Sequence, residues 1–192
     1  MNNKWKWVYN PFEKVAGWKA FGIGIIILGI TTITGYFGDT VFYGISVKLV
    51  PDITWSMAFS LQALGLAVTV IIMYITALFF AKHVRFQDIL GTVTLAKYPL
   101  ILMAFLSLIF GNKLASAIDV SKIINNKITF SDYTLLFVFG IIAITVIVWV
   151  IALLYHAFKV STNLKGVKCG ILFTILMLVS EIITIILVSV LY

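Results

Sequence analysis

The sequence predicts an all-α, polytopic integral membrane protein with five transmembrane helices and short interfacial helices. Two observations carry this prediction. Of the 192 residues, 62% are hydrophobic and only 11% are charged, whereas soluble proteins carry about 25% charged residues. The apolar residues also fall in runs long enough to cross a hydrocarbon core of about 30 Å. We therefore expect one membrane domain with short connections and no separate soluble domain.

Residues 1–19 are predicted to form a cytoplasmic segment at the membrane interface. Aromatic and Lys side chains mix along this stretch, and both favour the headgroup layer. Asn10, Pro11 and Glu13 occupy positions typical of a helix start, with Asn as the N-cap and Pro in the first turn. We expect a short interfacial helix that runs into the first span. An extended anchoring tail is the alternative.

The hydrophobic runs place the five spans, which are followed by only short polar connections. Glycines in the first span, at Gly22, Gly24 and Gly29, would allow close packing against a neighbouring helix. Gly35 and Gly38 mark the end of that span. The spans are expected at residues 20–37, 55–81, 90–110, 133–158 and 169–191.

The second span contains a lone amide, Gln62, which should find a partner inside the bundle. Beside it, Ala63 and Ala67 form a small-xxx-small pair that favours helix packing. The third span contains Lys97 and Pro99. Either a helix begins near residue 89 and Lys97 extends back to the interface, or the helix is broken at Pro99; we favour a single helix kinked near Pro99.

The longest connection, residues 111–132, is predicted to contain a partly amphipathic helix that lies on the membrane. At its end, Ser131 or Asp132 is expected to cap the fourth span.

Positive charges predict the orientation across the membrane. Lys and Arg are concentrated in the segments on the N-terminal side of the bilayer, and cytoplasmic segments are enriched in these residues. We therefore expect a multi-pass inner-membrane protein with its N-terminus in the cytoplasm and its C-terminus outside. The N-terminal side carries Lys4, Lys6, Lys14, Lys19, Lys82, Arg85, Lys97, Lys159, Lys165 and Lys168, and the other side carries Lys48, Lys113, Lys122 and Lys127.

Glu181 is the outlying charge, because it falls in the middle of the fifth predicted span. A carboxyl group near the bilayer midplane is costly and should face the bundle interior. It would serve either as a proton or cation site or as a structural group hydrogen-bonded to a hydroxyl, such as that of Thr34 or Thr145. Lys97 is a candidate partner at a depth that differs by roughly 8 Å. Its ammonium group is nevertheless expected to reach back to the cytoplasmic interface.

The cytoplasmic side brings together further candidate residues. His83, His156 and Asp88 map to this side and offer nitrogen and oxygen ligands, but their spacing matches no metal motif. We predict no metal site and no cofactor. Five basic residues are expected to form a face that contacts lipid headgroups or partner proteins: Lys82, Arg85, Lys159, Lys165 and Lys168.

Signatures of enzymes and of nucleic-acid binding are not found in the sequence. It contains no nucleophile elbow, no phosphate-binding loop and no dinucleotide fingerprint that opens a helix. The net charge of +7 comes from residues that flank apolar spans, so lipid headgroups explain it better than nucleic acid does. We expect no catalytic residues.

Three stretches carry a family resemblance: NPFEKVAGWKAF before the first span, FQDILGTVTLAKYPLILMAF leading into the third, and YHAFKVSTNLKGVKCGILF between the last two. They resemble the Yip domain family (Yip-one, the Ypt/Rab-interacting membrane proteins) in its bacterial branch. The likeness covers nearly the whole chain and implies a small five-span membrane protein. The Asp-Leu-Tyr-Gly-Pro motif of eukaryotic members is missing, which argues against Rab-type GTPase binding.

These observations favour a non-enzymatic membrane scaffold or adaptor with a basic cytoplasmic face. Its expected partners are membrane lipids, and also other membrane proteins or further copies of itself. The alternative is a small proton- or ion-coupled transporter that uses Glu181 and Lys97.

Overall fold

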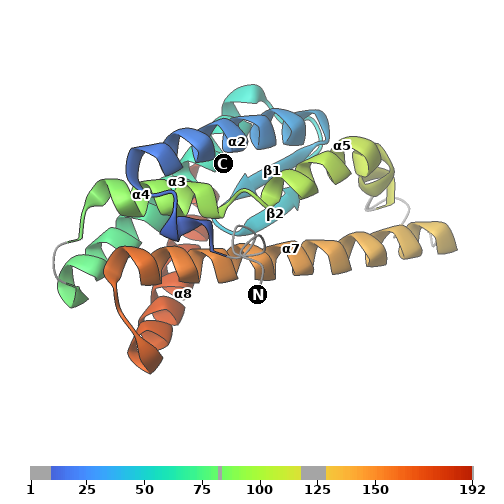
Figure 1. The fold of residues 1–192 in the computed structure, drawn as a ribbon. Coiled ribbons are helices and arrows are strands. Elements are labelled where there is room, and N and C mark those ends of the chain that lie inside the picture. Colours follow the sequence, from blue (N-terminus) through green and yellow to red (C-terminus); the bar gives the residue numbers. More distant parts are fainter. Residues whose placement is uncertain (1–9, 82–83, 118–128, 192) are drawn as a thin grey trace.

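The computed structural model describes residues 10–81, 84–117 and 129–191, which form a helical bundle that encloses one small hairpin (Figure 1). Five helices are long and apolar enough to cross a membrane, which confirms the predicted all-α, five-span class. Large apolar side chains such as Phe79 and Val190 are more than three-quarters exposed, as suits a surface that faces lipid tails. The five are Gly17–Phe37, Trp55–Phe80, Phe86–Gly111, Phe130–Thr162 and Gly166–Leu191.

The chain enters the bundle through a short turn rather than through an interfacial helix. Element η1 (Pro11–Glu13) is a three-residue 3-10 helix, and Phe12 within it is buried. The chain then leaves helical geometry before α2 begins at Gly17, whose φ of +60° suits glycine. The expected helix that runs into the first span is therefore wrong for the described residues. Residues 1–9 lie outside them.

Helix α2 (Gly17–Phe37) lies directly against the backbone of the third span. At Gly24, an added Cβ atom would stand 2.7 Å from the amide nitrogen of Leu95, so only glycine permits this approach. The predicted close packing is thus present at Gly24. Gly22 and Gly29 differ, because a Cβ atom there would meet nothing within 4 Å.

The third span is divided into α4 (Phe86–Ala96) and α5 (Leu100–Ala117), so the broken helix describes it and the single kinked helix does not. Pro99 has no N–H group to continue the helical ladder, and its ring obstructs the preceding turn. Shorter i to i+3 bonds replace that ladder: the Leu100 amide donates to the Lys97 carbonyl at 3.1 Å. The interfacial helix predicted after this span falls largely on residues 118–128, outside the described residues.

Between α2 and α3 (Trp55–Phe80) the sequence predicts only a short connection, but the structure contains a hairpin. Strand β1 (Thr40–Tyr43) pairs antiparallel with β2 (Ser46–Leu49), and all four residues of β1 are buried. The hairpin lies against α2, α3 and α5, and Figure 1 shows it inside the bundle. It is therefore a re-entrant element rather than a surface loop.

Helices α7 (Phe130–Thr162) and α8 (Gly166–Leu191) complete the bundle. The cap of α7 is Thr129 instead of Ser131 or Asp132: its hydroxyl accepts a hydrogen bond from the Asp132 amide, and Asp132 accepts one from the Thr129 amide in return. The second half of α7 supplies much of the core, whereas its first turns extend past α5 in Figure 1.

Candidate functional site

The tip of the hairpin is the centre of the candidate site. Gly44 and Ile45 form the two-residue loop between the strands, and Gly44 has a φ of +57°, as the first position of a type II′ turn requires. On α3, Gly65 stands so close to this tip that a Cβ atom there would clash with the Gly44 nitrogen. Gly65 lies ten residues into α3, about 15 Å along the helix. The tip therefore reaches well inside the membrane-spanning part of the bundle.

Glu181 on α8 binds this tip. Its Oε1 accepts a hydrogen bond from the backbone amide of Ile45, a loop residue outside the paired strands. Its Oε2 is buried and has no hydrogen-bond partner among the described residues. A cavity of about 220 Å³ adjoins Glu181 and is otherwise lined mainly by apolar side chains of α7 and α8. One carboxyl oxygen thus holds the hairpin and the other is uncommitted.

The hydroxyl partners expected for Glu181 bond within their own helices instead. The Thr34 hydroxyl donates to the Ile30 carbonyl at 2.7 Å, and the Thr145 hydroxyl donates to the Ile141 carbonyl at 2.9 Å. Neither bonds to Glu181. The structural role considered for this carboxyl group is therefore filled by a backbone amide.

Lys97 lies at the break between α4 and α5 and does not extend to the interface. Its side chain is only 1% exposed, so the expectation of a snorkelling lysine is wrong. As the C-cap of α4, it adjoins the negative end of a helix dipole, which favours a cation. Its charge also interacts electrostatically with that of Glu181. The structure thus places the two predicted intramembrane residues within range of an electrostatic interaction.

The end of the bundle where α3 and α7 finish and α4 and α8 begin is called here the basic end. Lys159 and Lys165 line a cavity of about 320 Å³ at this end, together with His156 and the η1 residue Glu13. The Asn10 amide nitrogen donates to Glu13 at 2.9 Å.

Two further basic residues belong to this end. Arg85 precedes α4, and the Lys168 ammonium group lies 5.7 Å from the centre of the Phe80 ring. Four of the five residues predicted to form the basic face lie at this end: Arg85, Lys159, Lys165 and Lys168. Lys82 lies outside the described residues.

The residues weighed as metal ligands do not assemble into a site that the structure can describe. No three His, Cys, Asp or Glu side chains gather as a metal site within residues 10–81, 84–117 and 129–191. Asp88 lies beside Gly17, where an added Cβ atom would be 3.3 Å from its Oδ1. His156 lines the cavity at the basic end. His83 lies outside the described residues.

Sequence reasoning missed Ile45, Gly44 and Gly65. The first two form the hairpin tip that Glu181 contacts, and Gly65 packs against that tip. A signal was present: the stretch TVFYGISVKL places Gly between two runs of β-branched and aromatic residues, which is typical of a hairpin. Its position between two apolar spans favoured the simpler interpretation of a loop.

Comparisons with known proteins do not assign this site to a family. The chain gives no significant match to a protein-family model, to a curated protein or to a solved structure. Any functional conclusion therefore rests on the residues and their arrangement.

Proposed function

We propose that the protein is a non-enzymatic integral membrane scaffold or adaptor whose basic end binds anionic lipid headgroups. The observation that carries this proposal is the cavity between η1 and the α7–α8 turn, which is flanked by Lys159 and Lys165. The excess of Lys and Arg at this end favours a cytoplasmic location in the inner membrane, with the N-terminus inside.

Electrostatics favour an anionic occupant at this cavity. A basic side chain near an anionic membrane surface contributes about 1 kcal/mol of attraction. Lys159 and Lys165 outnumber Glu13, the carboxylate that also lines the cavity, so the remaining positive charge would favour anionic over zwitterionic headgroups by about fivefold. Acidic segments of partner proteins, or of a further copy of the chain, would meet the same charges.

The test measures binding of short-chain phosphatidylglycerol and phosphatidylcholine to the purified protein in detergent. We expect tighter binding of phosphatidylglycerol, a loss of at least about tenfold in the Lys159→Glu/Lys165→Glu double variant, and weaker binding at high salt. Lys113→Glu is the matched control, because Lys113 is exposed on α5 and away from the cavity. Equal affinity of the double variant and the control would refute the proposal, whereas a loss confined to acidic protein partners would replace headgroups by proteins.

The second candidate function is proton- or ion-coupled transport, and a specific observation favours it. Transporters place their sites where helices are interrupted near the midplane, and here a broken helix carries Lys97 while Glu181 keeps one uncommitted oxygen. Such a carboxyl group can take up a proton without releasing the hairpin.

Transport is tested in proteoliposomes with a trapped pH indicator and an imposed ion gradient. Glu181→Gln keeps an oxygen that can accept the Ile45 hydrogen bond but removes the ionisable group, so coupled proton flux should be abolished. Glu13→Gln at the basic end is the control and should leave flux unchanged. Wild-type liposomes that show no flux above empty liposomes would eliminate this candidate.

A further inference from the structure

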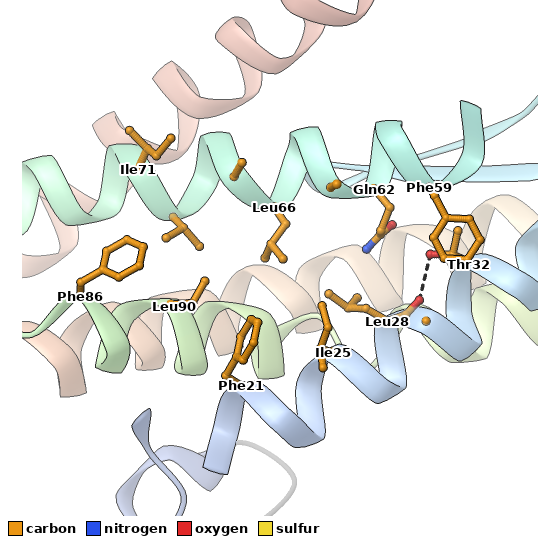
Figure 2. A pocket seen from close by; sticks show the side chains of 14 residues that line it. Phe21, Ile25, Leu28, Thr32, Phe59, Gln62, Leu66, Ile71, Phe86 and Leu90 are labelled. Carbon is orange, nitrogen blue, oxygen red and sulfur yellow. Dashed lines mark hydrogen bonds between the residues drawn. The ribbon is translucent and has the colours of Figure 1, made fainter. Parts of the chain in front are cut away.

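A lateral groove lies between α2 and α3 and shares no lining residue with the Lys159–Lys165 cavity; α4 contributes to its lining (Figure 2). Its volume is about 560 Å³, within the range of sites for small molecules. Helix α3 lines it with a stripe that runs from Phe59 to Ile71, and twelve residues of helix extend over about 18 Å. The groove is thus about as long as one leaflet of a bilayer is thick.

An aromatic cluster lies at the Phe59 end of the groove, and the groove is open along its side. Trp55 stacks on Tyr36 with their ring centres 3.9 Å apart, and Phe59 stacks on Trp55 at 6.1 Å. This aromatic cluster joins the end of α2 to the start of α3. Beyond it, the rim residues Ala63 and Ala67 are exposed toward the surrounding membrane. An occupant would therefore enter sideways from the lipid.

Gln62 is a polar residue of the groove whose side-chain oxygen lacks a hydrogen-bond partner among the described residues. Its side chain is 7% exposed, projects from α3 toward α2 in Figure 2, and has an Oε1 without a hydrogen-bond partner among the described residues. Thr32 also lines the groove, but its hydroxyl already donates to the Leu28 carbonyl at 2.9 Å. An amide left unpaired in apolar surroundings costs several kcal/mol. The groove is therefore suited to an apolar molecule that also carries a hydrogen-bonding group.

The depth of Gln62 matches the backbone of a membrane lipid. Helix α3 has 26 residues, so it is about 39 Å long and exceeds a hydrocarbon core of about 30 Å by roughly 4 to 5 Å at each end. Gln62 lies about 10 Å from the start of α3, and helical side chains point back toward the N-terminus. Its amide therefore comes close to the boundary between headgroups and tails, where the glycerol and ester groups of a lipid lie.

We propose that this groove is a binding site for one acyl chain of a membrane glycerolipid, with the Gln62 amide hydrogen-bonded to the glycerol or ester group of that lipid. The tail runs from Gln62 along the α3 stripe toward Phe86 on α4. A transmembrane helix of the same length and about 10 Å in diameter has a volume of roughly 1,400 Å³, so it would pack on the rim of the groove rather than lie within it. A single hydrocarbon chain is the occupant that the dimensions favour.

The test quantifies lipid that remains bound when the protein is released from membranes into mild detergent, by native mass spectrometry. Ala67→Phe should fill the groove and lower the bound fraction at least about tenfold. Ala152→Phe, at an exposed alanine of α7, is the matched control and should retain the wild-type fraction. Gln62→Leu, which keeps the shape of the side chain, should weaken retention about threefold to tenfold, the effect of one hydrogen bond.

Several outcomes would overturn the proposal. One is equal lipid retention by Ala67→Phe and Ala152→Phe when both variants are folded, as shown by protection of Cys169, the buried cysteine of α8, from thiol reagents. Another is a wild-type protein that carries no lipid but dimerises, with the dimer lost in Ala67→Phe, because the groove would then hold a helix of a second copy. The Lys159→Glu/Lys165→Glu variant should retain the groove lipid, so failure of the headgroup proposal leaves this one intact.

Discussion

Glu181 on the last helix accepts a hydrogen bond from the backbone amide of Ile45, a residue 136 positions earlier in the chain. The bond connects the hairpin after the first span to the final span. It also satisfies an amide that would otherwise be unpaired at the depth of the hydrocarbon core, where water is not available. The carboxyl group of Glu181, although costly to place in a membrane, therefore has a structural role in holding the hairpin.

Two substitutions of Glu181 should separate the effect of its hydrogen bond to Ile45 from the effect of its charge. Glu181→Ala leaves the Ile45 amide unpaired, and we expect a loss of about 1–3 kcal/mol in stability. Glu181→Gln retains an acceptor oxygen and should lose clearly less. Thermal unfolding can be followed by the rate at which a thiol-reactive dye labels Cys169, because this single cysteine is buried. If the two variants unfold at the same temperature, the hydrogen bond does not contribute as described.

Gly44 should tolerate no side chain. Its φ is +57°, and an added Cβ atom would stand 2.5 Å from Oε1 of Glu181. We expect Gly44→Ala to cost at least 1–2 kcal/mol from backbone strain alone, with a further loss from displacement of Glu181. Gly140→Ala is the control, since a Cβ atom at this position of α7 meets nothing within 4 Å. That change should be neutral or stabilising in the same Cys169 labelling assay.

Most of the bundle is predictable from the sequence, but the hairpin tip that Glu181 contacts is not. Long apolar runs dictate helices that cross the membrane, and an acid within such a run must turn inward, so the spans and the interest of Glu181 follow from local chemistry. Its partner does not follow, because every residue other than Pro carries a backbone amide. Attention to hydroxyl groups therefore pointed to Thr34 and Thr145, which bond within their own helices.

Lys97 illustrates a second limit of sequence reasoning. A lysine several residues inside a predicted span ordinarily reaches back to the interface. The helix is interrupted between Ala96 and Leu100, and the Lys97 side chain within this interruption is buried in the bundle. The presence of Pro99 indicated a disturbance of the helix, but it did not indicate on which side of the break the ammonium group would lie.

The N-terminal cap of α7 should contribute locally rather than globally. Thr129 and Asp132 form a reciprocal capping box at the start of a helix whose first turns are mostly exposed. We expect Thr129→Ala to weaken this helix end by about 1 kcal/mol and to accelerate hydrogen exchange in residues 130–134. Labelling of Cys169 should stay unchanged, because that residue lies on α8. Thr134→Ala, which removes a hydroxyl from the same turns without removing the cap, is the control; equal acceleration in both variants would contradict a capping role.

The electrostatic interaction between Lys97 and Glu181 should appear as an energetic coupling between substitutions of the two residues, measured in the stability of the protein. Removing one of two interacting charges leaves the other uncompensated, whereas removing both relieves that cost. We therefore expect Lys97→Met to destabilise the wild-type protein more than it destabilises the Glu181→Gln variant, with a coupling of about 0.5–3 kcal/mol.

The four unfolding temperatures of this cycle, measured by Cys169 labelling, provide the coupling. A parallel cycle with Lys113→Met, a change at an exposed lysine of α5, should be additive. Additivity in the Lys97 cycle as well would show that the two charges act independently, so that Glu181 serves the hairpin alone.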